Sequence, residues 1–154
     1  MWSHPWTGTA GRSREPGTHT PSLRPRCDFE AFVQLYGPQY WRYARTRLDD
    51  DGLGTEAVAW TFGHIEARWD CVLGLSQPMT VCWSLLRDTV SSRSAQGRQD
   101  GDWLHSVLPE TAADAVLLRY RLGVDLPDAA RLMGIGVGTV GVELRVALRM
   151  LARP

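Results

Sequence analysis

The chain contains no lysine among its 154 residues, so arginine supplies all 17 basic side chains, and 17 acidic side chains balance them. A dedicated nucleic-acid binder usually carries a clear basic excess. The zero net charge therefore disfavours strong DNA binding by the chain alone. Any anion contact would have the forked, two-point geometry of a guanidinium group.

Long apolar runs are also missing, and none approaches the length of about 18 residues that a membrane span needs. The N-terminus lacks the apolar central region of a signal peptide. Cysteine is scarce: Cys27, Cys71 and Cys82 do not have the close spacing of a zinc knuckle. We expect no membrane contact, no metal, a cytoplasmic location and reduced, mostly buried thiols.

Catalytic patterns are not found either. His4, His19, His64 and His105 are scattered along the chain. The glycine-rich stretch at 134–138 precedes no phosphate-loop lysine and follows no strand pattern. We therefore expect no enzyme activity, no catalytic residues, no cofactor and no small-molecule substrate.

Strand patterns and internal repeats are absent, whereas apolar residues recur at helical offsets of three and four. Residues 1–26, rich in Arg, Pro and Gly, predict a disordered tail. Residues 27–93 predict a helical domain. Its first helix is capped by Asp28 and is interrupted by a break at Gly37-Pro38. A turn follows at 49–54, and two further helices begin at about Thr55 and at Pro78. Residues 94–108 predict a linker, and 109–154 a second helical domain.

The second domain has the clearest pattern. Pro109 opens a helix that Gly123 ends as a left-handed cap, and a short helix is predicted at 126–133. Gly134-Ile135-Gly136 is the turn before a last helix at 137–151. Five residues of this last helix are expected to face the core: Val140, Leu144, Ala147, Leu148 and Leu151. Two helices joined by a glycine-containing turn form a helix-turn-helix, a common DNA-reading unit.

The residues of this unit strongly resemble the C-terminal domain of bacterial sigma factors of the extracytoplasmic-function (ECF) type. The resemblance rests on Val116–Tyr120, Leu122-Gly123, Leu126, Ala129-Ala130, Leu132–Ile135 and Val137–Val140. It implies an all-α fold of two small helical domains joined by a flexible linker, the second of the sigma C-terminal type, winged-helix-like but wingless. In that family the domain docks on the polymerase flap and reads the minus-thirty-five element.

The resemblance extends more loosely over the front half and assigns three groups of site residues. DNA contacts are expected from Val137, Gly138, Thr139, Val142, Arg145 and Arg149. Polymerase-clamp contacts are expected from Glu56, Ala59, Trp60 and Glu66. Strand opening at the minus-ten region is expected from Trp83, Arg87 and Asp88, although a tryptophan on such a helix is more often a core residue. The implied partners are core RNA polymerase, promoter DNA and an anti-sigma or other regulatory protein.

Several contact positions depart from the family pattern. After Gly-Thr-Val the family usually has basic residues and a serine, where this chain has Gly141, Val142, Glu143 and Val146. Phosphate contacts supply most of the affinity for DNA, and Glu143 would repel the backbone. The clamp helix has Ala59-Trp60 in place of Gln-Glu, and the strand-opening helix has Asp88 in place of Asn.

Three functions are therefore open. The first is an ECF-type sigma factor that directs promoter-specific initiation. The second is a sigma-derived interaction protein that keeps the fold but has lost most promoter contacts. The third, a stand-alone helix-turn-helix regulator, explains only residues 109–151.

Overall fold

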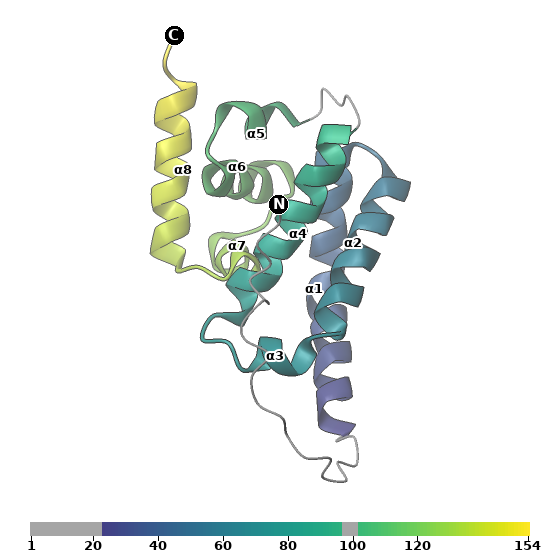
Figure 1. Ribbon diagram of the computed structural model, residues 1–154. Helices are drawn as coiled ribbons and strands as arrows, with labels where there is room; N and C mark the ends of the chain where they lie inside the picture. The colour runs from purple at the N-terminus through teal and green to yellow at the C-terminus, as the bar shows by residue number, and fades with distance from the viewer. Residues whose placement is uncertain (1–22, 97–101) are drawn as a thin grey trace, which may run out of the picture.

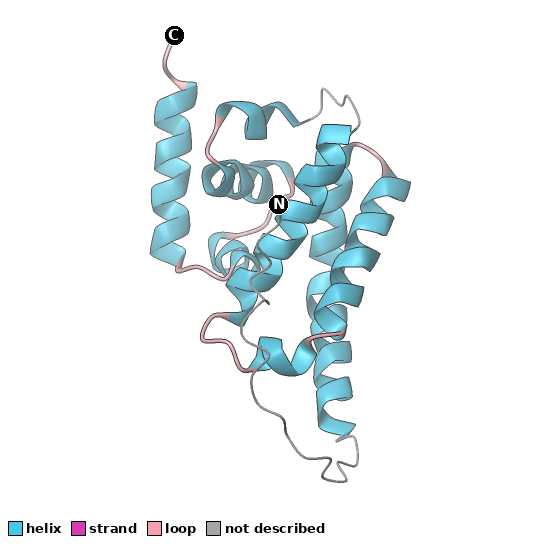
Figure 2. Cartoon of the chain, in the orientation of Figure 1, coloured by secondary structure: helices cyan, strands magenta, loops and turns pink. Residues whose placement is uncertain are grey.

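The computed structural model describes residues 23–96 and 102–154, and these residues are helical with no strand (Figure 2). This confirms the predicted all-α class. In the front half the helices are α1 (Leu23–Leu48), α2 (Asp51–Glu66), α3 (Trp69–Leu73) and α4 (Pro78–Gln96). In the second half they are α5 (Trp103–Val107), α6 (Glu110–Val116), the π-helical turn η2 (Leu117–Arg121), α7 (Leu126–Met133) and α8 (Val137–Leu151).

The predicted tail falls for its first 22 residues outside the described part of the chain, and residues 23–26 already belong to α1. The expected start at Asp28 is therefore wrong by five residues. Pro25 is compatible with this earlier start because the first amides of a helix need no intrahelical acceptor. None of the described helices is long and apolar enough to cross a membrane.

Helix α1 runs without a break through Gly37 and Pro38, contrary to the prediction. The rings of Phe32 and Tyr40, on either side of the proline, both pack on Phe62 of α2, at centroid distances of 5.7 and 5.4 Å. Pro38 itself is exposed. Tertiary packing on both sides of the proline thus holds the helix together, although a proline in the interior costs about 3 kcal/mol.

The acidic turn is also shorter than predicted, because α2 begins at Asp51 rather than near Thr55. Asp50 is the N-cap and accepts a hydrogen bond from the amide of Leu53 at 2.8 Å. Asp51 lies in the first turn, where a negative charge is favoured by the helix dipole. The last two of the three consecutive aspartates therefore start α2, and the turn between the helices is only Asp49 and Asp50.

The predicted linker at 94–108 contains more structure than expected. Helix α4 continues to Gln96, and α5 occupies Trp103–Val107, so only 97–101 lie outside the described residues. Leu104 and Leu108, four residues apart, are both buried. Their burial anchors α5 to the body of the molecule.

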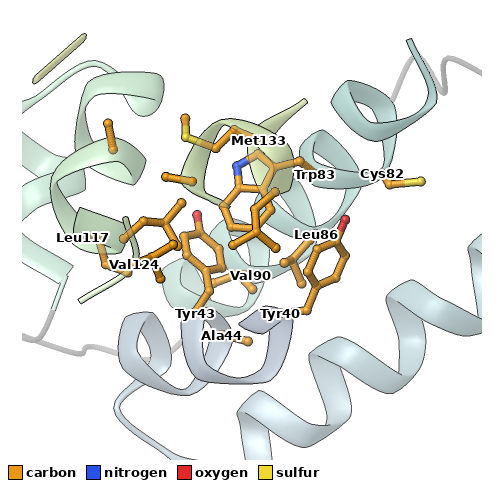
Figure 3. Packing of buried hydrophobic residues seen from close by; sticks show 14 of the residues in the cluster. Tyr40, Tyr43, Ala44, Cys82, Trp83, Leu86, Val90, Leu117, Val124 and Met133 are labelled. Carbon is orange, nitrogen blue, oxygen red and sulfur yellow. The ribbon is translucent and has the colours of Figure 1, made fainter. Parts of the chain in front are cut away.

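The core is continuous across the two halves of the described chain (Figure 3). Tyr40 and Tyr43 of α1 pack against Trp83 of α4, with ring centroids 5.6 and 4.6 Å away. Buried residues of the second half, including Leu117, Val124 and Met133, belong to the same cluster. Helices α1, α2 and α4 form the first layer, and α5–α8 pack on its α4 side (Figure 1).

Two cysteines have described side chains, and they differ. Cys82 is buried, and this burial raises the pKa of its thiol to about 12. Cys71 is exposed, so the expectation of buried thiols is wrong there, because its position on the five-residue helix α3 points away from the core.

Candidate nucleic-acid interface

The helix-turn-helix is formed by α7, a tight turn and α8. Asp125 caps α7 by accepting a hydrogen bond from the amide of Asp128 at 2.9 Å. Gly134 ends α7 in the left-handed conformation, with φ 68° and ψ 32°. Gly123, at φ 66°, is the second glycine with positive φ. Both glycines occupy the positions that the sequence predicts for them.

The turn between α7 and α8 packs against the start of α4. The hydroxyl of Thr80 donates a hydrogen bond to the carbonyl of Gly134 at 2.5 Å. A Cβ atom at Gly134 would lie 2.2 Å from the amide nitrogen of Thr80. Glycine is therefore required at this turn both for its backbone conformation and for the close approach of α4.

Helix α8 has one buried and one exposed face. Val140, Leu144 and Ala147 are buried against α6 and α7. The six residues predicted to contact DNA are all exposed: Val137, Gly138, Thr139, Val142, Arg145 and Arg149. Leu148 and Leu151, predicted to face the core, are 56% and 41% exposed. That prediction is wrong because α6 and α7 leave the end of α8 uncovered.

The charges on this helix are sparse. Arg145 and Arg149 are four residues apart and lie on one side of α8. Three positions that are polar or basic in the family are partly buried at the margins of the exposed face: Gly141, Glu143 and Val146. The face presents two guanidinium groups with Val142, 46% exposed, beside them.

The predicted polymerase contacts lie on the outward side of α2. Glu56, Ala59, Trp60 and Glu66 are all exposed. Trp60 is 46% exposed and stacks on His64, with ring centroids 5.1 Å apart and an interplanar angle of 10°. Glu56 is 3.7 Å from a guanidinium nitrogen of Arg93. The outward side of α2 thus presents an aromatic stack that is available to a partner.

The structure does not bring the three predicted strand-opening residues to one surface. Asp88 is exposed, whereas Trp83 is 1% exposed and packs in the core. Its indole N–H donates to a carboxylate oxygen of Asp114 at 2.9 Å, and Arg87 pairs with the same oxygen at 3.3 Å. Trp83 has no access to a DNA strand in this arrangement.

Asp114 is the centre of a buried polar network that the sequence analysis missed. Its side chain is fully buried and is the acceptor for Tyr43 Oη at 2.6 Å as well as for Trp83 and Arg87. His105 Nε2 lies 2.7 Å from Asp114 Oδ1, the oxygen that also accepts from Tyr43. The one signal in the sequence is an aspartate set between Ala113 and Ala115 in an otherwise apolar run.

A second carboxylate completes the network. Asp102 receives two hydrogen bonds from Arg47, at 2.9 and 2.7 Å, and lies 2.5 Å from His105 Nδ1. Burial opposes ionisation of Asp102, but hydrogen bonds from His105 and Arg47 outweigh it and lower the pKa of its carboxyl group. Burial alone would lower the pKa of His105, yet the hydrogen bonds to Asp102 and Asp114 raise it above the ordinary value.

The geometry of α7, the glycine turn and α8 defines a helix-turn-helix domain. Residues 104–151 match the sequence family described as sigma-70, region 4. This segment is therefore similar to sigma-70 region 4, and the match confirms the resemblance over the C-terminal part of the chain.

A chain in a solved structure of an RsbN–BldN complex has 20% sequence identity and a TM-score of 0.40, over 85% of this chain and 96% of that one. No curated protein matches.

Proposed function

We propose that the chain is a divergent sigma factor of the ECF type, which binds core RNA polymerase and directs initiation at particular promoters in the cytoplasm. The observation that carries this proposal is the region 4 domain at residues 104–151, whose exposed α8 face holds Arg145 and Arg149. Residues 27–93 would bind the polymerase clamp and help open the minus-ten region. Residues 94–108 would link them to the reading domain at 109–154.

A chain with zero net charge can still read a promoter if it is held near the DNA by polymerase. When two weak sites are tethered to one partner, the second contact forms at a high effective concentration. The α2 face around Trp60 would hold the clamp, and α8 would then need only a modest affinity for the minus-thirty-five element. An anti-sigma or other regulatory protein is the expected inhibitor.

Run-off transcription with purified core polymerase and a genomic promoter library tests the proposal. We expect core binding and transcripts from a small set of promoters. If no promoter is used and core polymerase is not bound, the chain is not a sigma factor.

We predict that Trp60→Ala weakens binding to core polymerase at least tenfold, because exposed aromatic residues commonly dominate interfaces, at about 2 kcal/mol or more each. Stability should change little, since Trp60 is 46% exposed. Trp103→Ala is the matched control, because Trp103 is 53% exposed on α5. Equal losses for both variants in a pull-down with quantified bound fraction would contradict a specific role for α2.

Restoring positive charge on α8 should increase DNA affinity. We predict that Gly141→Arg, Glu143→Arg and Val146→Arg together strengthen binding to duplex DNA about tenfold or more at low salt. Each new phosphate contact should also steepen the salt dependence by about one unit of log–log slope. Fluorescence anisotropy at several salt concentrations measures both quantities.

The matched control places the same change in net charge on exposed α1 positions, with Glu30→Arg, Ala31→Arg and Leu35→Arg. An equal gain in the control would mean that net charge, and not its position on α8, determines the affinity.

The second candidate function is a sigma-derived interaction protein. The observation that favours it is the internal use of Trp83 and Arg87, which are bound to Asp114 and not presented to DNA. It predicts a stable protein partner and only non-specific DNA binding. Sequence-specific, tight promoter binding by the unmodified chain would refute it.

A further inference from the structure

The contact between the two halves of the chain is polar at its centre and complementary in charge. The front half supplies donors and cations: Tyr43, Arg47, Trp83 and Arg87. The second half supplies carboxylates, of which Asp102 and Asp114 are 9% and 0% exposed. Glu110, 66% exposed, lies 3.7 Å from Arg87 at the edge. The front half thus carries the positive side of the contact and the second half the negative side.

His105 lies between the two buried carboxylates, and each of its ring nitrogens is within hydrogen-bond distance of one of them, at 2.5 and 2.7 Å. An ionised carboxylate only accepts hydrogen bonds, so both contacts are satisfied when both ring nitrogens carry protons. The side chain of His105 is 7% exposed. Water therefore has little opportunity to replace either contact.

With a charged imidazolium the network holds three cations, Arg47, Arg87 and His105, and three anions, Asp102, Glu110 and Asp114. Loss of the imidazolium proton removes one of the two N–H donors, so one of the buried carboxylates loses its hydrogen bond from the ring.

We propose that His105 is a proton-controlled latch that holds the helix-turn-helix half closed on α1 and α4 when it is charged, and releases it when it is neutral. This inference rests on the proposed function for its biological meaning, because the closed form buries Trp83, engages Arg87 and seats the α7–α8 turn on α4. In the closed form, strand-opening side chains are occupied by the carboxylate of Asp114. Release exposes them.

The direction of the pH dependence follows from the groups around the ring. Tyr43 and Arg47 face it from α1, Arg87 from α4, Asp102 from the start of α5, and Glu110 and Asp114 from α6. The carboxylates raise the pKa of His105 in the closed form, against the effects of burial and Arg47. The stabilisation of the closed form is therefore complete below the ordinary imidazole pKa of about 6.5 and is lost as the pH rises through the raised value.

Small-angle X-ray scattering of the full chain from about pH 6 to about pH 9 tests the latch, with the ring protons of His105 followed by NMR. We expect a compact form at low pH and a larger radius of gyration at high pH, with one transition that coincides with the His105 titration. A radius of gyration that stays constant over this range overturns the proposal, whether or not His105 titrates.

Two histidine variants test whether His105 causes the transition. His105→Gln keeps a side chain of similar reach without the charge, and it should give the expanded form at every pH. His64→Gln is the matched control, because His64 lies on α2 and stacks on Trp60; this variant should keep the transition of the parent. If His105→Gln stays compact, or if His64→Gln also removes the transition, the latch is refuted.

A third variant covers the case in which His105→Gln fails to fold. Asp102→Asn preserves the shape of that side chain but removes a charge next to the ring, so the transition should move to lower pH by about 1–3 units. An unchanged midpoint would overturn the proposal. Scattering needs neither DNA nor polymerase, so a chain that fails in transcription can still show the latch, and the two failures are distinguishable.

Discussion

Replacing Asp114 with alanine is expected to lower the free energy of unfolding by about 3–5 kcal/mol, the range for breaking a buried ionic cluster. The side chain is fully buried and is shared by Tyr43, Trp83, Arg87 and His105. Without it, an indole N–H and a phenol inside the core lose their acceptor, and buried polar groups without partners are costly. Urea unfolding followed by circular dichroism measures the loss.

The matched control for this prediction is Asp128→Ala. Asp128 also pairs with an arginine, Arg131, at 3.0 Å, but the two side chains are 51% and 58% exposed. Exposed pairs contribute about 0–1 kcal/mol, so little should change beyond this range. Comparable losses for Asp114→Ala and Asp128→Ala would show that the network around Asp114 contributes no more than a surface ion pair.

The second large effect is expected for Gly134→Ala. The left-handed conformation alone costs a residue with a Cβ atom about 1–2 kcal/mol. The new Cβ atom would also lie 2.2 Å from the amide nitrogen of Thr80 and 2.6 Å from the carbonyl carbon of Met79. Because these are backbone atoms, the turn must move away from α4, and we expect a total loss greater than 2 kcal/mol, about the upper end of the conformational term. Thermal unfolding measures it.

Gly141→Ala in the same helix-turn-helix is the control, and it should have the opposite sign. A Cβ atom at Gly141 meets nothing within 4 Å, and the residue lies inside α8. Alanine in a helix interior is about 0.5–1 kcal/mol more favourable than glycine. If Gly134→Ala does not lower the stability, the contact between the turn and α4 is not tight.

The helix-turn-helix was predictable because its signals are local. Gly123 and Gly134 have positive φ where the sequence places helix ends, and α7 and α8 have the predicted bounds. A glycine cap depends on one residue and its immediate neighbours, so no knowledge of the rest of the fold is needed.

Features that depend on distant contacts were not predictable. The π-helical turn η2, in which the amide of Leu122 donates to the carbonyl of Leu117, shifts the phase of the helix. Tyr120 lies in this turn and is 62% exposed, although Leu117, three residues before it, is buried. A spacing rule that assumes 3.6 residues per turn fails after such a turn.

In the candidate site, too, features set by local spacing were predictable and features set by distant contacts were not. The exposed positions of α8 and α2 follow from helical spacing, and the structure places all of the predicted residues there at the surface. Whether they contact DNA and polymerase is still a prediction. By contrast, Asp114 binds Arg87, Trp83 and Tyr43, which are 27, 31 and 71 positions away in the sequence. Such pairings arise only when α6 is packed against α1 and α4.

The aromatic contacts in the core have an optical consequence. The rings of Phe32, Tyr40, Phe62, Trp83 and Tyr43 lie within 6.1 Å of their neighbours in T-shaped, tilted or stacked orientations. Rings held in a rigid asymmetric setting give circular dichroism in the near ultraviolet, and that signal disappears when side-chain packing is lost even if helices persist. The near-ultraviolet band therefore reports the packing of α1, α2 and α4, while the far-ultraviolet band reports helix content.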